Sequence, residues 1–107
     1  MNAKNRFDLV YAPQVKTHLQ AIERKYHSLI RRTIETQLQF EPNVETRNKK
    51  PLKRPAELGA DWEIRFGPDN CFRVFYSVEQ ENWQVFILAI GIKRKNRLTI
   101  GREEVNL

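Results

Sequence analysis

The sequence predicts an α+β fold in which a small, curved antiparallel sheet of about four strands packs on an N-terminal helical hairpin. Apolar residues recur with helical spacing between positions 15 and 38, whereas they alternate with polar residues from position 62 onward. Turn-forming residues separate the alternating segments. The expected order of elements is β-α-α-β-β-β, and 107 residues leave room for a single domain, 1–107, with one small core.

The N-terminal half is predicted to hold one strand and two helices. Residues 7–11 have the pattern of a short strand, and Pro13 suits the first turn of a following helix. Apolar residues that share one face of this helix are Val15, Leu19, Ile22 and Tyr26. Ser28 is the expected N-cap of the second helix. The apolar face of that helix repeats every four residues at Ile30, Ile34 and Leu38.

The C-terminal half is predicted to be a long loop followed by three antiparallel strands. Residues 42–61 hold three prolines and few large apolar side chains, which is typical of a loop. Loops of this length inside a compact domain are usually functional. The three expected strands cover residues 62–66, 71–79 and 83–92. The last is the most hydrophobic and is expected at the centre of the sheet.

Composition excludes several classes of protein. No segment has the ~20 apolar residues that a transmembrane helix needs. The first twelve residues lack the apolar core and cleavage site of a signal peptide, so we expect a cytoplasmic protein. Cys71 is the single cysteine and has no partner for a disulfide or for a CxxC zinc motif. We therefore expect no metal and no cofactor.

Basic residues are concentrated in two segments of the second half. The chain has 19 Lys and Arg against 13 Asp and Glu, which gives a net charge of +6. Eleven of the nineteen lie in these segments: Arg47, Lys49, Lys50, Lys53, Arg54, Arg65, Arg73, Lys93, Arg94, Lys95 and Arg97. A compact fold that brings both segments onto one surface suits a polyanion such as RNA.

The order of elements resembles the RelE/ParE-type toxins of bacterial type II toxin–antitoxin systems, which include RelE-like mRNA interferases. The segments that carry the resemblance are Lys50-Pro51-Leu52-Lys53, Trp62-Glu63-Ile64-Arg65, Phe72-Arg73-Val74-Phe75-Tyr76, and the strand 85–91 with Lys93-Arg94 after it. The resemblance implies one RelE/ParE-like domain and a cognate antitoxin as partner. In the RelE branch it implies mRNA cleavage on the 70S ribosome, and in the ParE branch it implies poisoning of DNA gyrase.

A metal-free ribonuclease must activate a 2′-hydroxyl, stabilise a pentacoordinate phosphorane and protonate the 5′-oxygen. Lys50 and Lys53 are predicted to transfer protons, because neighbouring cations favour the neutral form of a lysine. Arginine suits the phosphate, since its planar fork stays charged and holds two oxygens at once. Arg65 and Arg73 are the predicted phosphate clamps, because a hairpin that turns at residues 67–70 brings them together.

Other basic residues complete the predicted site. Lys93 or Arg94 matches a further catalytic basic position of the family. The expected RNA-binding residues are Arg47, Lys49, Arg54, Lys95 and Arg97. The family's tyrosine or histidine a few positions later is missing, because the chain has Leu98-Thr99-Ile100-Gly101 there. Lys93, Arg94 or Tyr76 would then supply the proton.

Three alternatives stay open from the sequence. Glu63 is a possible general base beside Arg65, as carboxylates are in some relatives. Arg65 and Arg73 are alternatively ordinary surface charges that pair with Glu63, Glu79 or Glu81. The whole chain is alternatively a ParE-like toxin without nuclease activity, or a degenerate toxin that mainly binds its antitoxin.

Overall fold

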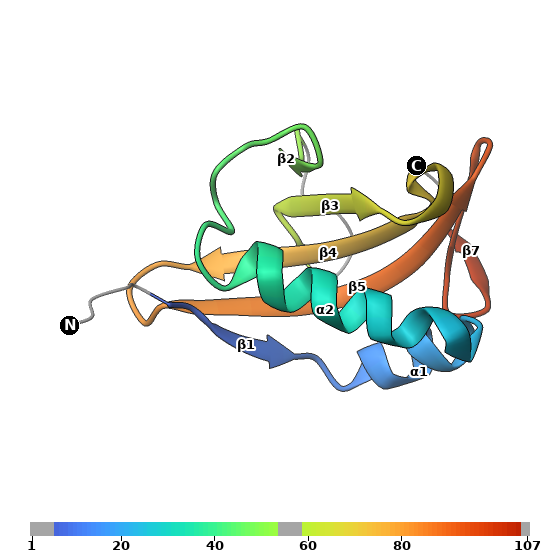
Figure 1. Cartoon of the computed structure of the whole chain (residues 1–107), viewed down its shortest axis with the longest axis horizontal. Helices are drawn as coiled ribbons and strands as arrows, with labels where there is room; N and C mark the ends of the chain where they lie inside the picture. The colour runs from blue at the N-terminus through green and yellow to red at the C-terminus, as the bar shows by residue number, and fades with distance from the viewer. Residues whose placement is uncertain (1–5, 54–58, 106–107) are drawn as a thin grey trace.

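The computed structural model describes residues 6–53 and 59–105, which form one curved sheet with two helices on one face (Figure 1). Helix α1 spans Gln14–Gln20 and helix α2 spans His27–Leu38, with a 3-10 turn, Arg24–Tyr26, between them. Neither helix of the described residues has the length and apolar character needed to cross a membrane. The six predicted elements are all present, in the predicted order.

The sheet has seven strands among the described residues, more than the expected four. Strand β1 spans Asp8–Tyr11 and pairs in parallel with β5. The other strands follow one another in antiparallel order: β2 (Lys49–Pro51), β3 (Trp62–Phe66), β4 (Phe72–Glu79), β5 (Gln84–Arg94), β6 (Arg97–Ile100) and β7 (Glu103–Val105). The sheet is therefore mixed rather than purely antiparallel, because the helical hairpin carries the chain across one face between β1 and the later strands.

Strand β5 is the spine of the sheet, and its outer edge changes partner half way along. β1 pairs with residues 84–87, and β6 pairs with residues 91–94. Helix α1 fills the gap: Gln14 Nε2 donates to the carbonyl of Leu88 at 3.2 Å, and the N–H of Ile90 donates to His18 Nδ1 at 3.2 Å. Because Gln14 and His18 are four residues apart, both point from one helix face to this edge.

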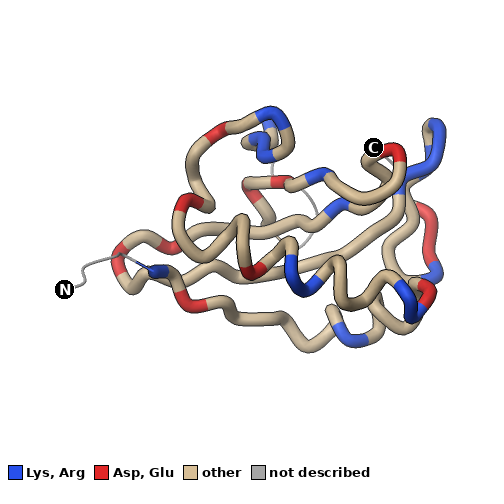
Figure 2. The backbone as a smooth tube through the Cα atoms, in the orientation of Figure 1, with Lys and Arg blue, Asp and Glu red and all other residues tan. Residues whose placement is uncertain are grey.

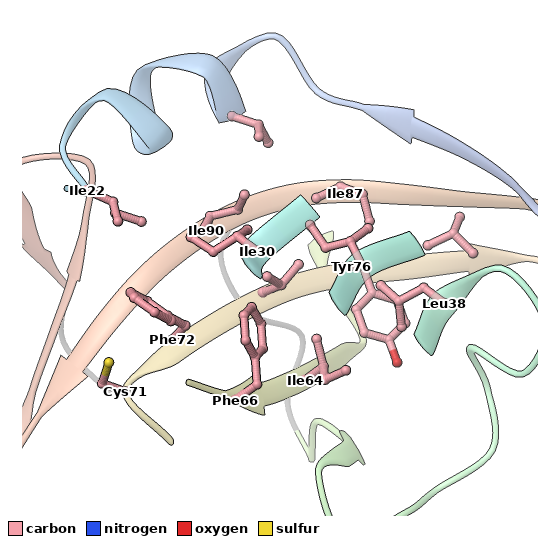
Figure 3. Close-up of a cluster of buried hydrophobic side chains, with 14 of the residues drawn as sticks. Ile22, Ile30, Leu38, Ile64, Phe66, Cys71, Phe72, Tyr76, Ile87 and Ile90 are labelled. Carbon is pink, nitrogen blue, oxygen red and sulfur yellow. The ribbon is translucent and has the colours of Figure 1, made fainter. Parts of the chain in front are cut away.

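The main core lies between the helices and the sheet (Figure 3). Ile30, Ile34 and Leu38 from α2 pack against the helix-facing side chains of β3, β4 and β5. Tyr76 is fully buried among them, and its hydroxyl donates to the carbonyl of Pro42 at 2.7 Å. Trp62 is half-buried and stacks on Tyr76, as expected for a core residue.

Two expectations about the helices are wrong. Helix α1 ends at Gln20, so Ile22 and Tyr26 reach the core from the connection rather than from one continuous helix. Ser28 is not an N-cap, because α2 begins one residue earlier, at His27, and its N-terminus has no side-chain cap. The residue at the N-cap position of α2 is instead Tyr26, the last residue of the 3-10 turn that precedes the helix.

Lowering the pH is expected to destabilise the fold through His18. Burial lowers the pKa of His18 from its ordinary value of 6.5, because removal from water disfavours the charged ring. The ring Nδ1 accepts the hydrogen bond from the Ile90 N–H. As the pH falls below about 6.5, the unfolded chain takes up this proton first, so the free energy of unfolding drops. Urea denaturation between about pH 8 and pH 5 measures this. His18→Gln keeps an acceptor without the titration and is expected to lose this part of the pH dependence; equal pH dependence in both proteins would contradict it.

Candidate functional site

The centre of the candidate site is a pair of arginines on neighbouring strands. Arg65 on β3 lies directly opposite Arg73 on β4. Their sequence neighbours Ile64 and Val74 belong to the core under the helices, so both arginines project from the other face of the sheet. Like charges directly opposite each other destabilise a strand pair, so this register needs an anion nearby.

Glu63 supplies that anion. Arg65 Nε donates to Glu63 Oε2 at 2.5 Å, and Arg73 Nη1 lies 3.5 Å from the same oxygen. The Glu63 side chain is 8% exposed, against 12% for Arg73 and 44% for Arg65. Burial lowers the pKa of Arg73, and Glu63 opposes that shift. Arg73 stays charged at neutral pH because an arginine starts from so high a pKa.

Both arginines therefore pair with Glu63, which was one of the ion pairs that the sequence left open as an alternative. One carboxylate between two guanidinium groups still leaves a net positive charge. Glu79 and Glu81, the other acids considered, make no ion pair with these arginines in the described part of the chain. The arrangement differs from an isolated surface ion pair, because two guanidinium groups contact the same oxygen of a buried carboxylate.

Strand β2 adds basic residues beside the arginines. Lys50 lies opposite Glu63 in the register, which places it toward the open face, and its Nζ is 3.3 Å from Glu45 Oε2. The charged group beside Lys50 is thus a carboxylate, whereas the predicted proton-transfer role assumed neighbouring cations. Arg47 and Lys53 are exposed, whereas Arg54 lies outside the described residues.

Lys49 corrects an expectation, because it is not part of the exposed basic surface. It is 4% exposed, and it alternates with Lys50 so that it points under the sheet. Its Nζ donates to the carbonyls of Glu41 and Gln37, at 2.7 and 3.3 Å, just beyond and within the last turn of α2. Burial lowers the pKa of Lys49, and the charge of Glu41 opposes that shift. The ammonium group thus satisfies carbonyls that the end of a helix leaves without partners.

The structure separates Lys93 from Arg94. A β-bulge shifts the register between β4 and β5, so that Tyr76 pairs with Ile87 while Phe75 pairs with Ala89. Beyond the bulge Gly91 lies opposite Arg73, and Lys93 shares that face of the sheet. Arg94 projects to the helix-facing side. Of the two residues, Lys93 is therefore the one on the arginine face.

Apolar residues fill the open face next to the arginines. Phe75, Ala89, Leu98 and Ala60 form a second buried cluster, against which Ile100 packs. Leu98 and Ile100 thus have a packing role at the positions where the resemblance to RelE/ParE-type toxins implied a tyrosine or histidine. Tyr76, the proposed substitute, is buried on the helix side, and burial raises its pKa well above its ordinary value. Tyr76 is therefore not a proton donor on the open face.

Charge is unevenly distributed over the molecule. Figure 2 shows Lys and Arg gathered around β2 and at the hairpin that joins β5 to β6, with further basic positions on β3 and β4 between them. Lys95 and Arg97 are exposed at this hairpin. Acidic residues mark the turn between β4 and β5. From the sequence, Glu63 was only an alternative general base, although its spacing of two residues from Arg65 already placed the two side chains on one face of the strand.

The fold has a recognisable relative. No protein-family profile matches the sequence, and no curated protein matches it. A chain in the crystal structure of the toxin–antitoxin complex RelBE2 from Mycobacterium tuberculosis is similar, with a TM-score of 0.67 over 84% of this chain and 94% of that chain. This chain has a RelE-type fold. The two sequences are 21% identical, so the likeness concerns the fold, and the function is argued from the site.

Two adjacent lysines are expected to behave differently when their charge is removed. Lys49→Met leaves two part-buried carbonyls without their donor and should lower the free energy of unfolding by about 1–3 kcal/mol. Lys50→Met loses a half-exposed ion pair, so its effect should stay within about 0.5 kcal/mol. Urea denaturation of both variants at one pH makes the comparison. Equal losses would show that Lys49 has no special structural role.

Proposed function

We propose that this chain is the toxin of a toxin–antitoxin pair, and that it cleaves mRNA on the ribosome by attack of a 2′-hydroxyl. The arginine pair held by Glu63 carries the proposal, because it offers two phosphate-binding groups next to a carboxylate. The RelE-type fold supports it. The charge of +6 also favours a polyanionic target. A ribosomal target places its action in the cytoplasm.

Phosphate binding is the first step of the proposed mechanism. Arg65 and Arg73 turn from Glu63 to the non-bridging oxygens of the scissile phosphate, where they stabilise the charge of the phosphorane. Arg73 is the more buried of the two, so water screens its charge less. Lys50, Lys53 and Arg47 hold the neighbouring phosphates along the β2 edge.

Proton transfer completes the reaction. Once the arginines have turned to the phosphate, the Glu63 carboxylate takes the proton of the 2′-hydroxyl, whose oxygen bonds to phosphorus. The bond from phosphorus to the 5′-oxygen breaks, and Lys93, on the same face, gives that oxygen a proton. The products are a 2′,3′-cyclic phosphate and a 5′-hydroxyl. The reaction uses no cofactor, and Glu63 replaces Lys50 as the preferred base.

A second function is supported by a different observation. The open face beside the arginines is apolar where a nuclease of this fold would carry an aromatic or imidazole acid. These apolar side chains are buried packing residues rather than acids, and the loss of the expected acid favours binding over cleavage. The alternative is therefore a ParE-like toxin that acts on DNA gyrase, or a degenerate toxin that mainly binds its antitoxin. In every case the proposed partner is an antitoxin whose acidic or amphipathic segment covers the basic face.

Replacing Arg73 tests the proposal in cells. Expressed Arg73→Ala should lose mRNA cleavage by at least about 100-fold, because oxyanion-stabilising groups contribute that much. Arg73→Lys should restore little, since an ammonium group does not hold two oxygens at once. The control Arg32→Ala changes an exposed arginine of α2 and should cleave normally. Mapping 5′-hydroxyl ends on ribosome-bound mRNA measures cleavage. Intact mRNA with inhibited DNA supercoiling would instead support the ParE-like alternative.

A further inference from the structure

A second pair of opposed arginines closes the hairpin between β5 and β6. Arg94 lies directly opposite Arg97 in the register. The two residues that join them, Lys95 and Asn96, form the turn, and Lys95 has a φ of 57°. A lysine rarely adopts this left-handed conformation, which costs about 1 kcal/mol or more. Three positive charges therefore lie within four residues.

This pair differs from Arg65 and Arg73 in one respect. No carboxylate within residues 6–53 and 59–105 forms an ion pair with Arg94 or Arg97. Glu104 on β7 lies opposite Thr99, two residues along β6 from Arg97, and makes no ion pair with Arg94 or Arg97. In the described part of the chain, no ion-paired carboxylate offsets the repulsion between Arg94 and Arg97 as Glu63 does for the first pair, so the two charges destabilise the ladder.

The second pair also lines a cavity. A space of about 750 Å³ opens between the helix-facing side of the hairpin and the end of α1. Its lining is cationic at Arg94, Lys95 and Arg97, apolar at Ile92, and hydrogen-bonding at Asn96 and Thr99. This volume is within the roughly 300–1,000 Å³ that is usual for ligand sites.

We propose that this cavity binds one nucleotide of an RNA strand, with a phosphate on Arg94 and Arg97 and the nucleoside against Ile92. The subsite is separate from the Arg65–Arg73 pair, because Arg94 projects from the opposite face of β5. It rests on the proposed function, since the strand is the RNA that the toxin engages. Asn96 and Thr99 offer donors and acceptors to the base or to the 2′-hydroxyl.

Phosphates suit this cavity better than the side chains of an acidic protein segment. Each nucleotide of an RNA strand carries one negative charge, and the cavity lining offers Arg94, Lys95 and Arg97 to it. The apolar lining at Ile92 complements a base or ribose. A carboxylate side chain would meet the charges without using the apolar part of the cavity.

Binding of a non-cleavable RNA tests the subsite in the full-length protein. The probe is a fluorescein-labelled decamer with 2′-O-methyl riboses, which lacks the attacking hydroxyl. Arg94→Gln/Arg97→Gln should weaken its binding by at least about tenfold. The salt dependence should fall by about 0.7 in log–log slope, for the one phosphate that the two arginines share. Fluorescence anisotropy at several salt concentrations measures both.

The matched control, Lys16→Gln/Arg32→Gln, removes the same charge from exposed positions on α1 and α2. It should weaken binding less than about twofold. Thermal unfolding of Arg94→Gln/Arg97→Gln should occur at or above the wild-type temperature, because the repulsion is gone. Photo-crosslinking of the wild-type protein to the same decamer carrying 4-thiouridine should label residues 92–99, which keeps the test independent of either variant.

Three outcomes would overturn the subsite: equal loss in the control variant, no crosslink at residues 92–99, or unchanged RNA affinity with weakened antitoxin binding. The last would assign the cavity to the protein partner. The readout needs no cleavage, so the two proposals fail separately. Intact cellular mRNA with a retained tenfold effect rejects only the nuclease. Cleavage that depends on Arg73 with unchanged RNA affinity in Arg94→Gln/Arg97→Gln rejects only the subsite.

Discussion

The arrangement of charged groups on the open face of the sheet depends on the interaction that keeps two arginines side by side. The register of β3 and β4 places Arg65 opposite Arg73, an arrangement that repulsion alone would disfavour. Glu63 offsets the repulsion through one oxygen that both guanidinium groups reach. The group formed by Arg65, Arg73 and Glu63 is also suited to bind a phosphate, because a phosphate can replace the carboxylate as the shared anion. The same contacts therefore stabilise the free protein and hold two phosphate-binding groups side by side.

The helix-facing side supports this arrangement through polar contacts at the sheet edges. Lys49 ties β2 to the end of α2, and β2 in turn pairs with the strand that carries Glu63 and Arg65. Gln14 and His18 complete the edge of β5 where neither β1 nor β6 pairs. Arg73 lies on the strand beside β5. The site thus lies on a sheet whose edges are anchored by side-chain contacts to α1 and to the end of α2.

Much of the fold could be predicted from the sequence, because alternation and turn residues define β3, β4 and β5. The expected strand 62–66 has the observed limits, and the turn at residues 67–70 sufficed to bring Arg65 and Arg73 together. Strand β2 could not be predicted, because three residues with two lysines and a proline have no strand pattern of their own. The inward direction of Lys49 follows only from the pairing of β2 with β3.

The sequence also could not predict on which face of the sheet Lys93 and Arg94 lie. Counting alternate residues from Val85 would place Lys93 on the helix side, but the bulge between β4 and β5 reverses the phase beyond Ile87. No local signal marks this bulge, since Leu88 is one apolar residue in a continuous apolar run. The second arginine pair also follows from pairing alone, because β6 continues a segment that the sequence presents as a basic tail.

The central claim is that Arg65 and Arg73 exchange Glu63 for a phosphate of the RNA. An NMR titration with a 2′-O-methyl RNA trinucleotide, in which the Nε signals of the arginine side chains are followed, tests this directly. We expect the Arg65 and Arg73 signals to shift together and to saturate at one RNA concentration, while the signal of Arg32 on α2 stays in place. Saturable RNA binding that leaves the signals of Arg65 and Arg73 unchanged would contradict it.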